Sequence, residues 1–284
     1  MRSLLFVPGD SERKFARAAD GPADALILDL EDSVVPARKP EARRITAGLL
    51  AAPRGRQRRY VRVNALDTGM TLADLAAVMP ARPDGVVLPK CAGGDQVRQV
   101  SLWLDAFEAA AGHPLGGTRI LVIATETAAS LFGLGSYAEA GPRLSGLIWG
   151  AEDLAASLGA SANRLDGKWL APFRLARDLC LASAAAAGVP AIDAVHVDIE
   201  DVTGLEADAR EARRDGFGGK AVIHPKQVEV VNAAFTPAPD ELDWARRVVA
   251  AFAAGGDAGV LRLDGKMLDR PHLRLAERLL AAGR

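Results

Sequence analysis

Eight short apolar runs alternate with helix-forming segments through most of the chain. Apolar runs without polar alternation are typical of strands that are buried on both faces of a parallel sheet. Eight strands, each followed by a helix, are the pattern of a (β/α)₈ barrel, and single barrels reach this length of 284 residues. We predict strands at residues 3–8, 25–30, 59–64, 86–90, 120–124, 146–149, 194–199 and 220–224.

The fold class predicted from this alternation is α/β, a TIM barrel followed by a C-terminal helical extension. We place the barrel at residues 1–236 and the extension at residues 237–284. The extension contains an amphipathic helix at 239–252, a hairpin-like turn at 261–265 and a last helix from about Pro271. Such an extension can cover the mouth of its own barrel or reach that of a neighbouring subunit. A doubly wound sheet is the alternative, although no G-x-G-x-x-G motif follows a predicted strand.

The composition argues against a general affinity for nucleic acid or for an acidic membrane surface. The chain has 35 basic and 36 acidic residues, which gives a formal net charge of −1. Its two cysteines, Cys91 and Cys180, lie far apart without metal-ligand spacing, so a reducing environment is expected. The apolar run at residues 3–8 is too short for a signal peptide or a membrane span. We therefore expect a cytoplasmic protein with neither nucleic acid nor membrane as a partner.

Two acidic residues follow neighbouring predicted strands in the middle of the chain. Glu126 comes after the fifth apolar run, and Asp153 comes after the sixth. Strand ends converge on one mouth in α/β barrels, where two such carboxylates repel one another unless a cation lies between them. Mg²⁺ takes oxygen ligands and usually only one or two protein carboxylates, so this pair is a candidate magnesium site. Spacing alone does not separate Asp153 from Glu152 as the ligand, and each acid could instead be a helix N-cap or first-turn acid.

A second group of acids ends the second predicted strand. Asp29, Glu31 and Asp32 lie within the sequence LDLEDS, and strand alternation puts Asp29 and Glu31 on the same face. These acids could contact a metal through water or pair with a cation at the same rim. A solvated loop in which Asp32 is a cap is the alternative.

Arg62 lies inside the third predicted strand, between two valines. An arginine in a strand that is covered on both faces is costly to bury without an anion. Its planar fork can bind a carboxylate through two hydrogen bonds, so it could pair with Asp29 or Glu31, or hold a substrate carboxylate. An outward-facing, solvated side chain is the alternative.

Basic residues at the start of the first predicted helix form a third feature. The helix dipole does not favour Arg13, Lys14 and Arg17 there, but an external polyphosphate passing nearby would explain them. A solvated basic face is the other interpretation. In the extension, Asp269 is by itself consistent with an N-cap before a helix that begins with proline.

Together these motifs resemble the citrate lyase β-subunit (CitE-like) family of the HpcH/HpaI aldolase/citrate lyase superfamily. The resemblance follows chain order and covers essentially the whole sequence. It is carried by RSLLFVPGDSERKFARA, LILDLEDSV, YVRVN, GVVLPK, IATETA, GLIWGAEDLAASLG, GKAVIHPKQV and DGKMLDRPH. It implies a (β/α)₈ barrel that assembles as a homotrimer or hexamer, binds Mg²⁺ and takes a CoA or acyl-carrier thioester as its substrate.

The resemblance also implies roles for individual residues. Glu126 and Asp153 match the metal ligands, with Glu126 next to the substrate, and Arg62 matches the arginine that binds the substrate carboxylate. Asp269 matches a carboxylate from the C-terminal segment that enters the mouth of a neighbouring subunit. The residues that match the region contacting the CoA phosphates are Arg13 and Lys14.

The function expected from this resemblance is a Mg²⁺-dependent carbon–carbon lyase. It would cleave a citryl-, malyl- or citramalyl-thioester to an acetyl-thioester and a keto acid, with Arg62 and Asp269 as catalytic residues. Some superfamily members use a histidine base near the second strand; this chain has no histidine before His113, which favours a carboxylate base. One alternative is a thioesterase or a malate synthase-like enzyme on the same site. The other is a subunit of a larger lyase complex that has no activity of its own.

Overall fold

The computed structural model describes residues 1–256 and 259–283, which form two compact units. The first unit is Met1–Asn232 and the second is Ala233–Arg284, so the division falls inside helix α9 (Pro225–Phe235). Among the described residues, no helix is both long enough and apolar enough to cross a lipid bilayer.

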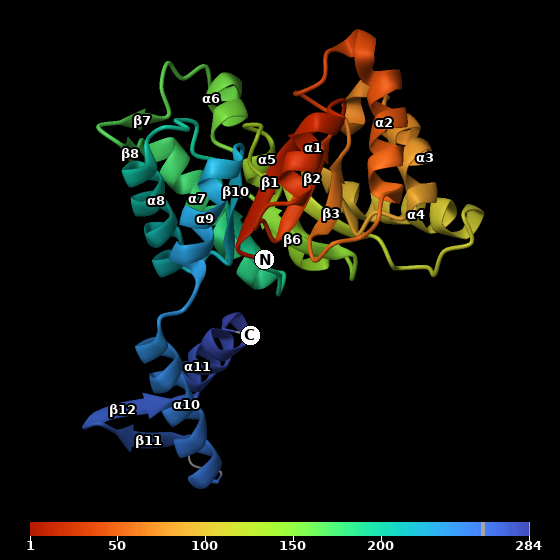
Figure 1. The fold of residues 1–284 in the computed structure, drawn as a ribbon. Helices are drawn as coiled ribbons and strands as arrows, with labels where there is room; N and C mark the ends of the chain where they lie inside the picture. Colours follow the sequence, from red (N-terminus) through yellow and green to blue (C-terminus); the bar gives the residue numbers. More distant parts are fainter. Residues whose placement is uncertain (257–258, 284) are drawn as a thin grey trace. The chain divides into compact units, whose positions relative to one another are not determined.

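The first unit is a closed barrel of eight parallel strands surrounded by helices (Figure 1). Neighbouring strands follow chain order around the barrel, and β1 closes the ring by pairing with β10. The barrel strands are β1 (Ser3–Pro8), β2 (Ala25–Asp29), β3 (Arg58–Arg62), β4 (Gly85–Leu88), β5 (Arg119–Ile123), β6 (Leu144–Ile148), β9 (Ala191–Asp193) and β10 (Gly219–Val222). The predicted TIM barrel is therefore confirmed, and the doubly wound sheet is excluded.

Helices connect the successive strands of the barrel. The α-helices are α1 (Glu12–Ala19), α2 (Lys39–Ala51), α3 (Thr71–Val78), α4 (Gly94–Ala110), α5 (Ser130–Gly133), α6 (Glu152–Leu158), α7 (Ala171–Ala186), α8 (Val202–Asp215) and α9. Short 3₁₀ helices lie at Pro36–Arg38, Leu66–Thr68, Met79–Ala81 and Leu134–Glu139.

The seventh barrel strand lies earlier than the sequence predicts. It is β9, Ala191–Asp193, whereas the predicted residues 194–199 lie outside any strand. The alternating apolar residues of this segment, Val195 and Ile199 among them, resemble a strand pattern but line cavities beside the barrel mouth. The prediction was wrong because a loop that lines a cavity can show the same period of two as a half-buried strand.

A small hairpin between α6 and α7 was not predicted. Its strands, β7 (Arg164–Leu165) and β8 (Lys168–Trp169), pair antiparallel across a turn in which Asp166 and Gly167 have φ values of +49° and +75°. Strands of two residues are too short to show any hydrophobic period, although the Asp-Gly pair is a turn signal.

The strand register brings the carboxyl ends of the strands to one end of the barrel. Pro8 of β1 pairs with Asp29 of β2, and Asp29 pairs in turn with Arg62 of β3. On the other side, Ile123 of β5 pairs with Ile148 of β6. Residues that follow these pairs therefore begin the loops of a single mouth, which is where barrels of this type place their chemistry.

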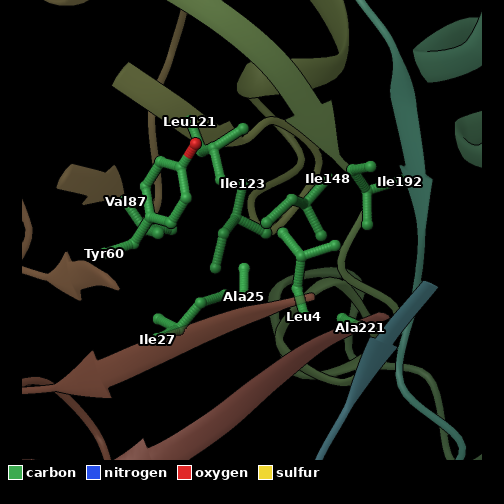
Figure 2. Close-up of a cluster of buried hydrophobic side chains, with 10 residues drawn as sticks. All are labelled: Leu4, Ala25, Ile27, Tyr60, Val87, Leu121, Ile123, Ile148, Ile192 and Ala221. Atoms are coloured by element: carbon green, nitrogen blue, oxygen red, sulfur yellow. The ribbon is translucent and has the colours of Figure 1, made fainter. Parts of the chain in front are cut away.

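Apolar side chains from every barrel strand fill the interior (Figure 2). Gly85 leaves room for the largest of them, because a Cβ atom there would lie 2.5 Å from the ring of Tyr60. Burying a side chain such as Leu121 contributes about 1.5–3 kcal/mol, so this packed interior fixes the strands that carry the mouth.

The second unit contains two helices and a hairpin. Its elements are α10 (Pro239–Ala254), β11 (Val260–Leu263), β12 (Lys266–Asp269) and α11 (Arg270–Ala282). The two helices pack against each other, with Val248, Phe252 and Leu268 in their common core. The helix, the hairpin-like turn and the last helix predicted for the extension are all present.

Glu108 of α4 is a buried acid that ties the helix to the loop before β5. Its side chain is 1 % exposed and accepts hydrogen bonds from the backbone N–H groups of Gly116 (2.8 Å) and Thr118 (2.7 Å). Arg143 donates two more, at 3.0 and 2.6 Å. Burial alone would raise the pKa of this carboxyl, but the bonds from Arg143 and Thr118 lower it from 4.5 to about 2.

This lowered pKa predicts acid sensitivity that depends on Glu108. Below pH 4.5 the Glu108 carboxyl binds a proton in the unfolded chain but stays ionised in the native protein. The free energy of unfolding therefore falls as the pH decreases towards 2. The stability advantage of the wild type over Glu108→Gln should therefore shrink by roughly 1 kcal/mol between pH 6 and pH 3.5. Urea unfolding across this range measures it, and an advantage that does not change with pH would contradict the assignment.

Candidate active site

A cavity of about 330 Å³ opens at the carboxyl ends of the barrel strands. Acidic and basic side chains from four strand ends line it together with Trp149 of the loop after β6. The structure thus brings together charged residues that the sequence singled out at the ends of four predicted strands. Those that line the cavity are Asp29, Asp32, Arg62, Glu126, Glu152 and Asp153.

The loop after β2 is held in one conformation by hydrogen bonds. Asp29 accepts from the backbone N–H groups of Glu31 (2.9 Å) and Ser33 (3.1 Å), so its carboxylate closes the turn on itself. Beneath the loop, the buried ammonium of Lys39 donates to the carbonyls of Leu30 and Glu31, both at 2.7 Å. Asp29 and Glu31 are therefore buried and fixed in place, which argues against a solvated loop for these two acids, whereas the side chain of Asp32 is 57 % exposed.

Arg62 points into the cavity and binds two acids of this loop. Its Nε and Nη2 donate to the two oxygens of Asp29, each at 2.7 Å, and its Nη1 lies 2.8 Å from Glu31 Oε2. The guanidinium also lies over the ring of Phe6, at 4.9 Å from the ring centre. Burial would lower the pKa of Arg62, but the bonds and charge of Asp29 raise it, so the side chain stays charged.

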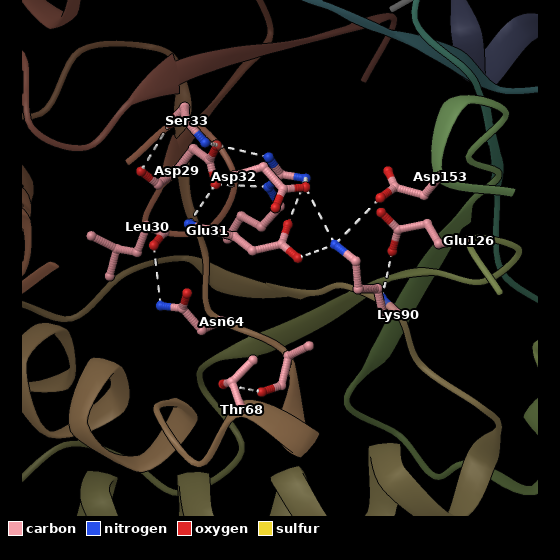
Figure 3. A network of polar contacts seen from close by, with 12 residues as sticks. Asp29, Leu30, Glu31, Asp32, Ser33, Asn64, Thr68, Lys90, Glu126 and Asp153 are labelled. Carbon is pink, nitrogen blue, oxygen red and sulfur yellow. Dashed lines mark hydrogen bonds and ion pairs between the residues drawn. The ribbon is translucent and has the colours of Figure 1, made fainter. Parts of the chain in front are cut away.

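Lys90 is a charged residue of the mouth that the sequence analysis missed. Its ammonium contacts Glu31 and lies 3.3 Å from Asp32 and 3.5 Å from Asp153 (Figure 3). Its backbone N–H donates to Glu126. Lys90 appears in the sequence only as the end of an apolar run, so the one signal for its role was a charge directly after a predicted strand.

Glu126 is the most deeply buried acid on the far side of the mouth from Arg62. The residue is 3 % exposed, and burial, together with the charges of Glu31 and Asp153, raises its pKa to about 8. The hydrogen bond from the Lys90 backbone acts in the opposite direction but does not prevail. A carboxyl with this pKa holds its proton at neutral pH until a cation replaces that proton.

Asp153 lies in the first turn of α6, next to Glu152. Its side chain is 38 % exposed and contacts Lys90, and its charge acts on Glu126. Glu152 instead accepts a 2.8 Å hydrogen bond from Asn163. The structure therefore favours Asp153 over Glu152 as the partner of Glu126.

We name Asp29, Glu31, Asp32, Glu126 and Asp153 the acidic cluster. Across the described residues, no three His, Cys, Asp or Glu side chains are arranged to hold a metal ion by themselves. Two carboxylates facing one cavity nevertheless fit Mg²⁺, which uses one or two protein carboxylates and completes its shell with water or substrate oxygens. Burial is the main cause of the raised pKa of Glu126, and the neighbouring charges of Glu31 and Asp153 add to it.

A second cavity, of about 540 Å³, borders the first beside α1. Both cavities are lined by Phe6, Val7, Pro8 and Ile223. The second also takes in the basic side chains that the sequence analysis assigned to a polyphosphate, which are Arg13, Lys14 and Arg17.

Asp269 belongs to the second unit, where it ends β12 and caps α11. Its carboxylate pairs with Nδ1 of His272 at 2.6 Å, and its side chain is 35 % exposed. The cap that the sequence suggests is present.

Gly150 places Glu126 by having no side chain. A Cβ atom at this position would lie 2.8 Å from Cγ of Glu126 and 3.2 Å from Cγ2 of Ile123. Gly150→Ala should therefore displace the Glu126 carboxyl and weaken Mg²⁺ binding about tenfold without unfolding the barrel. Calorimetric titration with Mg²⁺ measures the effect, and Gly48→Ala on α2, where nothing lies within 4 Å, is the matched control. Equal affinities for the two variants would show that the contact does not matter.

Comparison with known proteins identifies the family. The family model described as HpcH/HpaI aldolase/citrate lyase matches residues 2–225, and a carbon–carbon bond lyase model of the TIM-barrel fold matches residues 179–284. A (3S)-malyl-CoA thioesterase of Cereibacter sphaeroides is 37 % identical over 99 % of this chain and 93 % of its own. A mitochondrial citramalyl-CoA lyase of Mus musculus is 34 % identical over 98 % of this chain and 85 % of its own.

A solved structure extends the comparison to the coordinates. Protein CitE from Mycobacterium tuberculosis, in complex with magnesium, acetoacetate and coenzyme A, superposes with a TM-score of 0.77. It is 38 % identical in sequence, and the match covers 99 % of this chain and 97 % of that one. These matches span nearly the whole chain and therefore include the barrel and its charged mouth. The chain belongs to the HpcH/HpaI aldolase/citrate lyase family.

Proposed function

We propose that this protein is a Mg²⁺-dependent carbon–carbon lyase that acts on a CoA thioester. Its reaction is the reversible cleavage of a 3-hydroxy-3-carboxyacyl thioester, such as malyl-, citramalyl- or citryl-CoA, to an acetyl thioester and a keto acid. The observation that carries the proposal is the pair Glu126 and Asp153, which face one cavity together with Arg62. Relatives named for this chemistry, and a related structure that contains magnesium and coenzyme A, support it.

Glu126 and Asp153 are the residues that would hold the metal. Both supply oxygen ligands, and the proton that Glu126 retains is the one a divalent cation would replace. A bound Mg²⁺ supplies Lewis acidity to the oxygen that becomes the keto group. The neighbouring Gly150 keeps Glu126 in position for this role.

Arg62 would orient the substrate carboxylate. A guanidinium group carries five N–H donors, and Asp29 uses two of them while Glu31 lies beside a third nitrogen. The remaining donors can bind a substrate carboxylate in the cavity. The pairs with Asp29 and Glu31 hold the guanidinium group in one orientation while it does so. The interaction would fix the carbon–carbon bond in one orientation relative to the metal ligands.

The second cavity would receive the phosphate-bearing part of CoA. Arg13 and Lys14 lie on α1 beside a wall that the two cavities share at Phe6 and Pro8. A thioester group in the first cavity can therefore extend to phosphates bound by these cations. Free CoA fits this arrangement, and an acyl-carrier thioester would present the same phosphopantetheine.

Asp269 would exchange the proton at the carbon next to the thioester. In cleavage, the substrate hydroxyl would lose its proton to solvent as its oxygen becomes the keto group, and the electron pair of the broken carbon–carbon bond would pass to the acetyl enolate. Asp269 would then supply one proton to the enolate carbon, so that no proton is gained or lost overall. In the reverse direction it removes the same proton. Asp269 lies in the compact unit that follows the barrel. In a homotrimer or hexamer, this unit would enter the mouth of a neighbouring subunit. The enzyme would act in the cytoplasm.

A thioesterase is the second candidate, because one 37 % identical relative is named for that activity on malyl-CoA. Product analysis separates the two functions: a lyase yields glyoxylate and acetyl-CoA, whereas a thioesterase yields malate and free CoA. We expect lyase products from the purified chain and free malyl-, citramalyl- or citryl-CoA. Activity only after a carrier or partner protein is added would indicate a subunit of a larger lyase complex.

The metal ligands predict a common loss of activity. Glu126→Gln and Asp153→Asn should each lower kcat/KM at least about a hundredfold and weaken Mg²⁺ binding, since each removes one of the two protein ligands. Treatment with EDTA should abolish wild-type activity, and added Mg²⁺ should restore it. Asn163→Ala, which frees Glu152 but leaves Asp153, is the control and should keep most of the activity. Full activity in EDTA or in either ligand variant would refute the metal site.

The position of Asp269 predicts complementation between two inactive variants. If each mouth uses the Asp269 of a neighbour, mixed oligomers of Glu126→Gln and Asp269→Asn chains contain some mouths with both native residues. Co-expression in equal amounts should restore about a quarter of the wild-type activity, the fraction expected for random assembly. If Asp269 served the mouth of its own chain, no mouth would be complete and the mixed protein would be inactive.

A further inference from the structure

Lys90 contacts both sides of the acidic cluster. It follows β4 (Gly85–Leu88) with a left-handed backbone conformation, φ +50°, which residues other than glycine rarely adopt. In this conformation the backbone N–H donates to Glu126, and the side chain crosses the mouth towards Glu31 and Asp153 (Figure 3). The surroundings must fix such a conformation, which indicates that the direction of this side chain matters.

The two cations of the mouth are bound in different ways. Arg62 is 12 % exposed and is locked to Asp29 by two 2.7 Å hydrogen bonds. Lys90 is 27 % exposed, and its ammonium lies between Glu31 on one side and Asp153, at 3.5 Å, on the other. An ammonium group is a compact point charge on a flexible stem, so it can leave one carboxylate and keep another, which a bidentate arginine cannot.

We propose that Lys90 is a positioning residue that acts as an internal counter-cation and competes with the metal for Asp153. The inference rests on the proposed metal site. Without metal, the Lys90 ammonium neutralises Glu31, Asp32 and Asp153 and limits the repulsion within the acidic cluster. When Mg²⁺ binds, Asp153 passes to the metal, while Lys90 keeps Glu31 and Asp32.

This competition gives Lys90 opposite effects on two measurable quantities. A lysine ammonium near a carboxylate that serves as metal ligand repels the incoming dication, so removing the ammonium should strengthen Mg²⁺ binding. The same removal leaves carboxylates without a partner, so the metal-free protein should become less stable. If Lys90 only supported the shape of the site, its removal would lower both the stability of the protein and its affinity for Mg²⁺.

The test compares Lys90→Met and Lys90→Gln with the wild type by Mg²⁺ titration calorimetry and thermal unfolding in EDTA. Both variants keep the backbone N–H that holds Glu126. We expect Mg²⁺ to bind about three- to tenfold more tightly, the metal-free melting temperature to fall, and the Mg²⁺-induced rise in melting temperature to increase. Unchanged or weaker Mg²⁺ binding in a folded variant would overturn the inference. If Lys90→Met does not fold, the result for Lys90→Gln, which keeps a polar but uncharged side chain, decides the test.

Two controls separate charge from position. Lys90→Arg keeps the charge but can hold a carboxylate through two hydrogen bonds, so it should bind Mg²⁺ no more tightly than the wild type. Lys226, on α9, forms an exposed ion pair with Glu200. Lys226→Met removes the same charge there and should leave Mg²⁺ binding unchanged, because solvent screens that lysine. If Glu126→Gln and Asp153→Asn bind Mg²⁺ like the wild type, the metal site itself is wrong. If they lose Mg²⁺ while the Lys90 variants do not gain affinity, only the role given to Lys90 fails.

Discussion

Repulsion between carboxyl groups at the barrel mouth is the constraint on which the rest of the site depends. The parallel register brings the ends of β2, β5 and β6 to one place, and each is followed by acids that face the same cavity. Two side chains, Arg62 and Lys90, carry the positive charge against five acids. Removing one partner of a buried ion pair typically costs about 3–5 kcal/mol, so Arg62, whose pair with Asp29 is buried, stabilises the folded mouth as well as balancing its charge. Burial, together with the charges of Glu31 and Asp153, raises the pKa of Glu126 to about 8.

Each charged group of the mouth is held by a partner beneath or beside it. Lys39 binds the carbonyl groups of the loop after β2, and Asp29 closes the turn of that loop with its own carboxylate. Across the cavity, the backbone of Lys90 and the absence of a side chain at Gly150 determine where the Glu126 carboxyl lies. Such supports keep the acids close together despite their repulsion, which preorganises the site for a divalent cation. The proposed function uses this arrangement, because a metal ion held by these acids could also stabilise negative charge on a reacting oxygen.

The barrel could be predicted from the sequence because its signals are local. Apolar runs, helix starts and acids at strand ends occupy adjacent positions, so their pattern fixes the fold class and brings Glu126 and Asp153 to one mouth. The choice between Asp153 and Glu152 could not be made in this way, since it depends on a hydrogen bond from Asn163, a residue of the segment before the unpredicted hairpin. Lys90 was missed because the role proposed for it requires a left-handed backbone and partners that follow other strands of the barrel. The role proposed for Asp269 depends on a neighbouring subunit, and an interface between subunits leaves no periodic signal in the sequence.

The most direct test of the central claim is to locate the cation itself. Mn²⁺ takes oxygen ligands as Mg²⁺ does, so a crystal of the full-length protein soaked in Mn²⁺ would reveal the site by anomalous scattering. The account predicts one strong peak bonded to carboxylate oxygens of both Glu126 and Asp153, and no such peak in a crystal of Glu126→Gln. A peak bound elsewhere in the mouth, or one held by Glu152 in place of Asp153, would contradict it.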